Sequence, residues 1–263
     1  MNDSRHTKYL GLPSFIGRSK KQVFSALKEW MGQKLAGWKG KLLSMEGKEI
    51  LIKAVAQAIP TYTMSCFQLP QGLCEDLESM MRSFWWGQKH QETKMTWVGW
   101  KQMCFSKSRG GMGFRNLQAF NLAMLAKQAW KILTNPSSLI ARVLKARYFP
   151  TGDILSASLG SSPSYSWRSI FNSLSVIRKG TRWHVGNGKQ IHIWDDKWLP
   201  TPSTHKVISP PTSLPIFPMV SSLIDPATKW WRTKMIRSAF LPFEVDAILK
   251  IPFSCSLLDD NLI

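Results

Sequence analysis

The sequence has little negative charge, few cysteines and no long apolar run. Only 16 of its 263 residues are Asp or Glu, against 35 Lys and Arg, which gives a formal net charge of +19. The four cysteines include no CxxC pair, and the polar start of the chain has no secretory signal. No stretch approaches the roughly 20 apolar residues that span a bilayer. We therefore expect an intracellular protein, in the nucleus or cytoplasm, with no membrane partner.

The positive charge is concentrated in the first half of the chain. Residues 1–150 hold 23 basic and 8 acidic side chains, and residues 151–263 hold 12 and 8. A surface this basic repels itself unless a polyanion neutralises it. The first half is thus expected to contact phosphates of RNA, DNA or an RNA–DNA hybrid. A solvated basic surface without a specific partner stays open as the alternative.

Hydrophobic periodicity predicts a mainly α fold. Ser19 is a predicted N-cap, the second helix is expected to begin near Ser44, and Trp30 is predicted to lie in the core. The second helix is expected to bury Ile50, Leu51, Ala54, Val55 and Ala58, and the glycine-rich segment 107–115 is expected to be a loop. The predicted helices cover residues 19–36, 44–60, 71–85, 116–133, 138–148 and 167–179, with a short one near 243–249.

The second half has a weaker helical signal. Trp183, Val185, Ile191 and Ile193 alternate with polar residues around Gly186-Asn187-Gly188, a pattern typical of a β-hairpin. Residues 200–226 are rich in proline. The predicted architecture is therefore a large helical region followed by a smaller α/β appendage with one β-hairpin and an irregular, proline-rich tail.

Several short segments occur in the order in which they occur in one family. The chain resembles plant LINE-type (non-LTR) retrotransposon reverse transcriptases, in the part that follows the polymerase palm. The similarity covers roughly residues 8 to 200. Segments that carry it include Lys8-Tyr9-Leu10-Gly11-Leu12-Pro13, Leu35-Ala36-Gly37-Trp38-Lys39, Leu42 to Lys53, Phe84-Trp85-Trp86-Gly87, Gly110 to Leu117 and Arg147-Tyr148-Phe149-Pro150.

The resemblance implies a division of the chain into four parts. Residues 1–17 would be the remnant of the palm exit, and 18–150 a helical thumb or connection region that holds the template–primer duplex. Residues 151–200 would form a helix-plus-hairpin appendage, and 201–263 the irregular tail. In the family, the palm supplies the carboxylates that hold Mg²⁺, and a zinc-binding module follows the tail. Both lie outside this sequence, so we expect no catalytic residue, metal or cofactor here, with Mg²⁺ serving only the intact polymerase.

Two acidic pairs need separate interpretation. Asp195-Asp196 follows the predicted hairpin without a third acidic residue at suitable spacing, which favours a surface turn or cap over a metal site. Asp259-Asp260 is expected to be solvated. Cys66 and Cys74 have no zinc-finger partners at the right spacing, so buried free thiols are the better interpretation.

The candidate nucleic-acid contacts are basic residues of the first half and one tryptophan among them. Trp38 lies between Lys34 and Lys39 and could stack on a base. The full set is Lys20, Lys21, Trp38, Lys39, Lys41, Lys48, Lys53, Lys107, Arg109 and Arg115.

The functional hypothesis is a non-catalytic fragment of an RNA-directed DNA polymerase that binds RNA or DNA without sequence specificity. Two alternatives stay open: a decayed retroelement reading frame with no selected role, and a reverse transcriptase portion active only with a palm supplied in trans. Apolar surface left without a palm, around Phe15, Ile16 or Phe67, is expected to favour self-association or aggregation.

Overall fold

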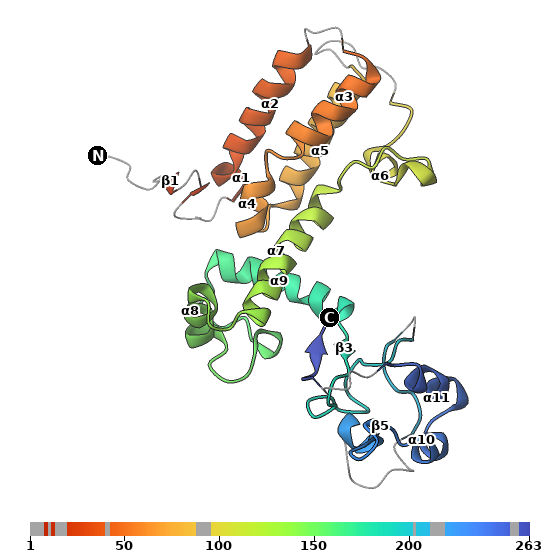
Figure 1. Ribbon diagram of the computed structural model, residues 1–263. Helices are drawn as coiled ribbons and strands as arrows, with labels where there is room; N and C mark the ends of the chain where they lie inside the picture. Colours follow the sequence, from red (N-terminus) through yellow and green to blue (C-terminus); the bar gives the residue numbers. More distant parts are fainter. Residues whose placement is uncertain are drawn as a thin grey trace. The chain divides into compact units, whose positions relative to one another are not determined.

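The computed structural model describes residues 8–9, 12–13, 20–39, 43–87, 96–201, 204–210, 219–252 and 258–263. By the contacts between its residues, the chain forms two compact units, Met1–Arg178 and Lys179–Ile263 (Figure 1). The expectation of a mainly α fold with a small amount of β structure is confirmed. The four-part division of the chain stays a prediction.

The first unit is built almost entirely from helices. A short antiparallel ribbon, β1 (Lys8–Tyr9) with β2 (Leu12–Pro13), precedes them. The π-helical turn η2 (Ile52–Ala56) continues directly from α3. The helices and 3-10 turns are α1 (Lys20–Val23), α2 (Ser25–Lys39), α3 (Met45–Leu51), α4 (Thr61–Cys66), α5 (Gln71–Trp85), α6 (Trp100–Met103), η3 (Lys107–Arg109), α7 (Leu117–Thr134), α8 (Leu139–Tyr148), η4 (Ile154–Ser156) and α9 (Tyr165–Gly180).

Local capping explains where several of these helices begin. The Ser44 hydroxyl accepts a hydrogen bond from Gly47 N at 3.2 Å, and the Asn116 side chain accepts one from Ala119 N at 2.8 Å. Ser138 caps α8 in the same way. Each cap satisfies a backbone donor that has no partner within its helix. The predicted helices of this unit are confirmed, and α5 matches its predicted range residue for residue.

Two apolar clusters form the core of the first unit. In the first, α2 packs on α5 and α4 packs on α7, around fully buried residues such as Met31 and Leu77 (Figure 1). The second cluster joins α7, α8 and α9 around Trp167, whose ring stacks on Tyr148 with centroids 4.6 Å apart. Asn121 of α7 is buried and accepts a hydrogen bond from Leu69 N at 2.8 Å.

The buried face of the second helix differs from the predicted one. Ile50 is 63% exposed, and the residues that enter the core are Ile52, Ala56 and Ile59. Nearly every residue from 50 to 58 is apolar, so the sequence pattern is compatible with more than one buried face. The wider π-helical turn rotates the following residues and so changes which face meets the core. Trp30, also expected in the core, is 47% exposed.

The second unit contains short elements around its own core. A small hairpin pairs β4 with β5, and β3 pairs with the last strand of the chain. Trp198 and Ile193 lie at the centre of the core, and α11 confirms the helix predicted near 243–249. The elements are β3 (Trp183–His184), η6 (Val220–Leu223), β4 (Ile224–Asp225), β5 (Trp230–Trp231), α10 (Thr233–Ala239), α11 (Pro242–Leu249) and β6 (Asn261–Leu262).

The predicted pairing of residues 183–185 with 191–193 is wrong. Trp183 pairs with Leu262 and His184 with Asn261, both antiparallel, while His192 forms an isolated bridge with Met219. The glycine segment 186–188, between the two predicted strands, closes around the carboxylate of Asp260 instead of forming a hairpin turn.

Asp260 is buried, which corrects the expectation that the Asp259-Asp260 pair is solvated. Its Oδ1 accepts hydrogen bonds from Gly186 N and Gly188 N, both at 2.8 Å, and its Oδ2 accepts one from Gln190 N at 2.9 Å. A side chain at position 186 would overlap the Leu258 carbonyl. The chain end thus organises a loop that lies about 70 residues earlier in the sequence.

The proline-rich tail is more ordered than predicted over residues 219–252. It supplies α10, α11 and the β4–β5 hairpin, and Ile236 and Ile248 are fully buried. The buried Glu244 carboxylate accepts hydrogen bonds from Ile208 N and Ser209 N, which ties residues 204–210 to α11. No helix in the described part of the chain is long and apolar enough to cross a bilayer.

Candidate nucleic-acid interface

Two of the predicted phosphate-contacting lysines meet at one carboxylate. Glu49 of α3 accepts a hydrogen bond from Lys53 Nζ at 2.7 Å, one helical turn later. Lys107 Nζ, from η3, lies 2.9 Å from Glu49 Oε1 and 3.2 Å from Oε2. The hydrogen bond from Lys53, and then that from Lys107, lower the pKa of Glu49. Two ammonium groups from separate segments therefore converge on one carboxylate.

The glycine-rich loop positions Lys107. Gly113 N donates to Phe105 O at 2.7 Å, and Met112 N donates to Met103 O at 2.9 Å, so the loop folds back onto the end of α6. A Cβ atom at Gly111 would overlap the Phe105 carbonyl, and Gly113 has a φ of 67°. Glycine is needed at both places because of close backbone approach at one and a left-handed conformation at the other.

Aromatic rings form the base beneath these cations. Phe114 stacks on Trp100 with centroids 5.1 Å apart and meets the edge of Trp85 at 5.4 Å. Lys53 Nζ lies 5.8 Å from the centre of the Phe114 ring, within range of a cation–π contact. The position of Lys53 is therefore set on one side by Glu49 and on the other by a packed aromatic ring.

The side chain of Lys48, a residue of α3, reaches the end of α5. Its Nζ donates to the carbonyl of Trp85 at 3.4 Å, in the last turn of that helix. Carbonyls in a last turn lack partners within the helix and carry the negative end of the helix dipole, which favours a cation there. Lys48, Lys53 and Lys107 thus lie on α3, η2 and η3, and the Lys48 side chain also contacts the end of α5.

The other predicted contacts lie elsewhere or outside the described side chains. Lys20 Nζ lies 4.9 Å from the Tyr165 ring centre, and the Arg115 guanidinium lies 4.5 Å from that of Phe120. Arg109 is exposed on η3. The side chains of Lys21 and Lys39, and Lys41 as a whole, fall outside what the structure describes.

The tryptophan singled out for base stacking is half-buried. The Trp38 ring packs against Phe84 with centroids 5.8 Å apart, at the edge of the first core cluster. Trp97 was not singled out, yet its side chain is 78% exposed. The sequence alone cannot show which of Trp38 and Trp97 is the more exposed, because both lie near lysines.

Glu49 is absent from the predicted contacts, because the residue types expected to contact phosphate are basic or aromatic. One signal was available: Glu49 and Lys53 are four residues apart, with the acid first, the spacing that favours an ion pair on a helix. No local pattern predicted the approach of Lys107.

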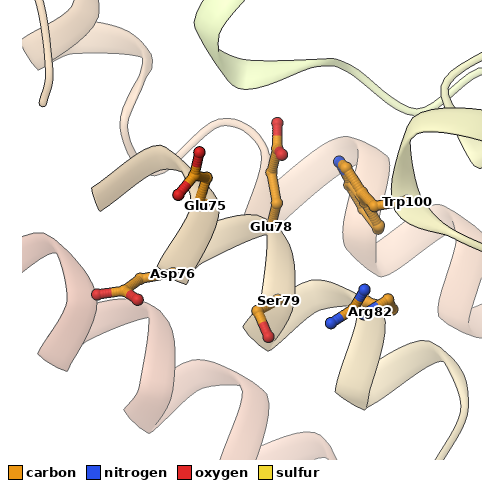
Figure 2. A pocket seen from close by; sticks show the side chains of 6 residues that line it. All are labelled: Glu75, Asp76, Glu78, Ser79, Arg82 and Trp100. Carbon is orange, nitrogen blue, oxygen red and sulfur yellow. The ribbon is translucent and has the colours of Figure 1, made fainter. Parts of the chain in front are cut away.

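A cavity of about 380 Å³ on α5 has the opposite charge character. Glu75, Asp76 and Glu78 line it with Arg82, and Trp100 closes one side (Figure 2). Burial raises the pKa of Glu78, while the hydrogen bond from Leu117 N, at 2.7 Å, and the nearby Trp100 indole oppose that rise. An anionic backbone would be repelled by these carboxylates.

The remaining candidates from the sequence have structural roles. Asp196 Oδ2 accepts a hydrogen bond from His192 N at 2.7 Å, so the Asp195-Asp196 pair lies in a turn, one of the two alternatives expected for it. Cys74 is a buried free thiol, and burial raises its pKa to about 12. Among the described residues, no three His, Cys, Asp or Glu side chains are grouped so that they could hold a metal ion.

Comparison with known proteins identifies relatives in Arabidopsis thaliana. The chain is 42% identical over 143 residues to the "Uncharacterized mitochondrial protein AtMg00310", and the match covers 54% of this chain and 93% of that protein. This chain belongs to the same family. The name of that relative states no activity, and no family model matches the chain.

A second relative is longer. The chain is 33% identical over 193 residues to the "Putative ribonuclease H protein At1g65750" of Arabidopsis thaliana. That match covers 72% of this chain and 31% of the relative, so the chain spans about a third of that protein's length.

Proposed function

We propose that this chain is a non-catalytic part of a retroelement RNA-directed DNA polymerase and that it holds RNA, DNA or their hybrid through backbone phosphates, without reading sequence. The retroelement origin is supported by its plant relatives, one of which is named for ribonuclease H, an activity on nucleic acid. The resemblance to LINE-type reverse transcriptases supports the finer assignment, with residues 18–150 as the thumb-like part.

The observation that carries the proposal is the convergence of Lys53 and Lys107. Ammonium groups repel one another, so two that approach the same point from separate segments mark a place where negative charge is favoured. The first half of the chain, which holds both, also holds most of the net charge of +19. Lys48 precedes Lys53 in the sequence, and Arg109 and Arg115 follow Lys107. These three residues extend the proposed surface. Trp38, Lys20, Lys21, Lys39 and Lys41 complete the proposed set.

The test is the salt dependence of binding. Fluorescence anisotropy with a short labelled DNA duplex should give an affinity that falls linearly on a log–log scale with salt. Each neutralised phosphate contributes about 0.9 to the slope, so five contacting cations would give a slope of about −4.5. Replacing Lys53 and Lys107 together by Ala should reduce its magnitude by about 1.8.

The control replaces two exposed lysines of the second unit, Lys206 and Lys234, by Ala. This variant loses the same charge and should keep the wild-type slope. A wild-type slope near zero, or equal losses in both double variants, would contradict the proposal.

The name of the longer relative favours one further assay. The chain should be tested with a labelled RNA–DNA hybrid and Mg²⁺ for cleavage of the RNA strand, and with a primer–template for extension. We expect no product in either, because the carboxylates that such metal-assisted chemistry uses are not recognised in this sequence. Activity dependent on the divalent ion would favour an enzymatic role.

A further inference from the structure

The Glu49 carboxylate occupies the point at which Lys53 and Lys107 converge. Its two oxygens lie within 3.2 Å of Lys107 Nζ, and one of them lies 2.7 Å from Lys53 Nζ. Carboxylate and phosphate oxygens accept charge-assisted hydrogen bonds from ammonium groups at similar distances. A backbone phosphate that used both lysines would therefore need the position that Glu49 now holds.

We infer that Glu49 is an internal competitor for the phosphate at this site, so that nucleic acid binds by displacing the Glu49 carboxylate from Lys53 and Lys107. The inference rests on the proposed function and adds how binding at that site is restrained. Glu49 limits the affinity for any polyanion, and only a ligand that supplies several phosphates together overcomes it.

The exposure of the three side chains gives the order of events. The Lys107 side chain is 67% exposed, whereas those of Lys53 and Glu49 are 35% and 16% exposed. Solvent and salt weaken ion pairs between exposed groups, so the Lys107 pair is the weaker of the two. An incoming phosphate takes Lys107 first and then competes for Lys53, which the Phe114 ring keeps in place.

The experiment compares two single substitutions on one helix. Glu49→Gln removes the competing charge, and Glu46→Gln removes one charge from an exposed side chain three residues earlier. The carboxylate of Glu46 interacts with Ser44 and its own backbone. Both variants change the net charge by the same amount, so they differ only in the contacts of the lost carboxylate.

The expected result is specific to Glu49. Affinity for the labelled duplex should rise roughly two- to twentyfold in Glu49→Gln, as expected for the release of two ion pairs at the protein surface. The salt slope should steepen by about 0.9. In a background with Lys53 and Lys107 both replaced by Ala, the same substitution should have no larger effect than Glu46→Gln. Equal effects of the two substitutions in the wild-type background, or weaker binding by Glu49→Gln, would overturn the inference.

A measurement on the wild-type chain guards against a misfolded variant. In protein labelled with ¹³C at the glutamate carboxyl carbons, the Glu49 signal should shift as duplex is added, while the Glu46 signal stays nearly constant. An unchanged Glu49 signal at saturation overturns the inference and leaves the proposed function standing. If the wild type binds no duplex at low salt, the proposed function itself fails.

Discussion

Replacing Asp260 by Ala should strongly destabilise the second unit. The carboxylate receives three backbone hydrogen bonds, from Gly186, Gly188 and Gln190, and is itself buried. Removing it leaves these donors without their acceptor. Gly188 is buried, Gly186 is partly buried, and Gln190 is exposed enough for water to replace the lost bond.

The magnitude follows from this difference in exposure. A buried donor without a partner costs about 1–3 kcal/mol, and hydrogen bonds to a charged group are at the upper end of the range. Counting the Gly188 donor fully and the Gly186 donor in part, Asp260→Ala should lower the free energy of unfolding by about 3–5 kcal/mol. Since domains unfold with about 5–15 kcal/mol, such a loss would leave the second unit marginally stable.

Urea unfolding provides the assay. Near-ultraviolet circular dichroism follows the tryptophans of both units, eight in the first and five in the second, and the second unit is followed by the transition that Asp260→Ala shifts. The matched control is Asp259→Ala, because Asp259 is exposed and its carboxylate accepts a hydrogen bond from the exposed Asn187 side-chain amide instead of from the backbone donors of the loop. The control should change stability by no more than about 0.5 kcal/mol. Equal urea midpoints for the two variants would refute the reasoning that Asp260 organises the loop.

Two other substitutions test the first unit. Gly111→Ala should lower its stability by about 1–3 kcal/mol, because the new methyl group overlaps the Phe105 carbonyl, whereas Gly99→Ala, which meets open space, should unfold thermally close to the wild type. Glu78→Gln should alter the pH dependence of stability. Burial raises the pKa of Glu78, so the folded wild type binds this proton more tightly than the unfolded chain and loses stability as pH rises from about 4.3 through the raised pKa. The variant lacks that loss, and parallel stability curves for the two proteins would contradict the assignment.

The helices were predictable because their signals are local. Asn116 and Ser138 mark the starts of α7 and α8 by side-chain caps, and each cap acts within three residues. The apolar spacing of α5 is regular enough to predict its range. At η2 the same reasoning failed, because a run of apolar residues leaves the buried face open and a π-helical turn has no simple sequence signature.

The errors in the second unit arise from long-range contacts. Residues 183–193 have the alternation and glycines of a hairpin, and nothing within that segment indicates otherwise. The deciding residue is Asp260, whose carboxylate satisfies three donors of the segment and brings β6 to pair with β3. Because that contact joins residues 72 positions apart, a pattern read along neighbouring residues could not contain it.

The candidate site depends both on local sequence signals and on long-range contacts. Its lysines were visible as individual charges, and the Glu49–Lys53 spacing was visible as a helical pair. Their relation to Lys107 depends on Phe114, which stacks on Trp100 and ends the glycine loop that carries Lys107. Phe114 also meets Trp85, whose carbonyl accepts from Lys48.

Phe114 thus contacts Lys53 directly, follows Lys107 in the glycine loop and meets Trp85, whose carbonyl accepts from Lys48. Apolar packing around Phe114 supports the segments that carry these lysines, and the Glu49 carboxylate holds the ammonium groups of Lys53 and Lys107 together. The repulsion between Lys53 and Lys107 is relieved in the free chain by Glu49 and, on the proposed function, by phosphate when nucleic acid binds. A site with this construction does not need to reorganise its backbone to bind, because exchanging one anion for another at a fixed pair of ammonium groups is sufficient.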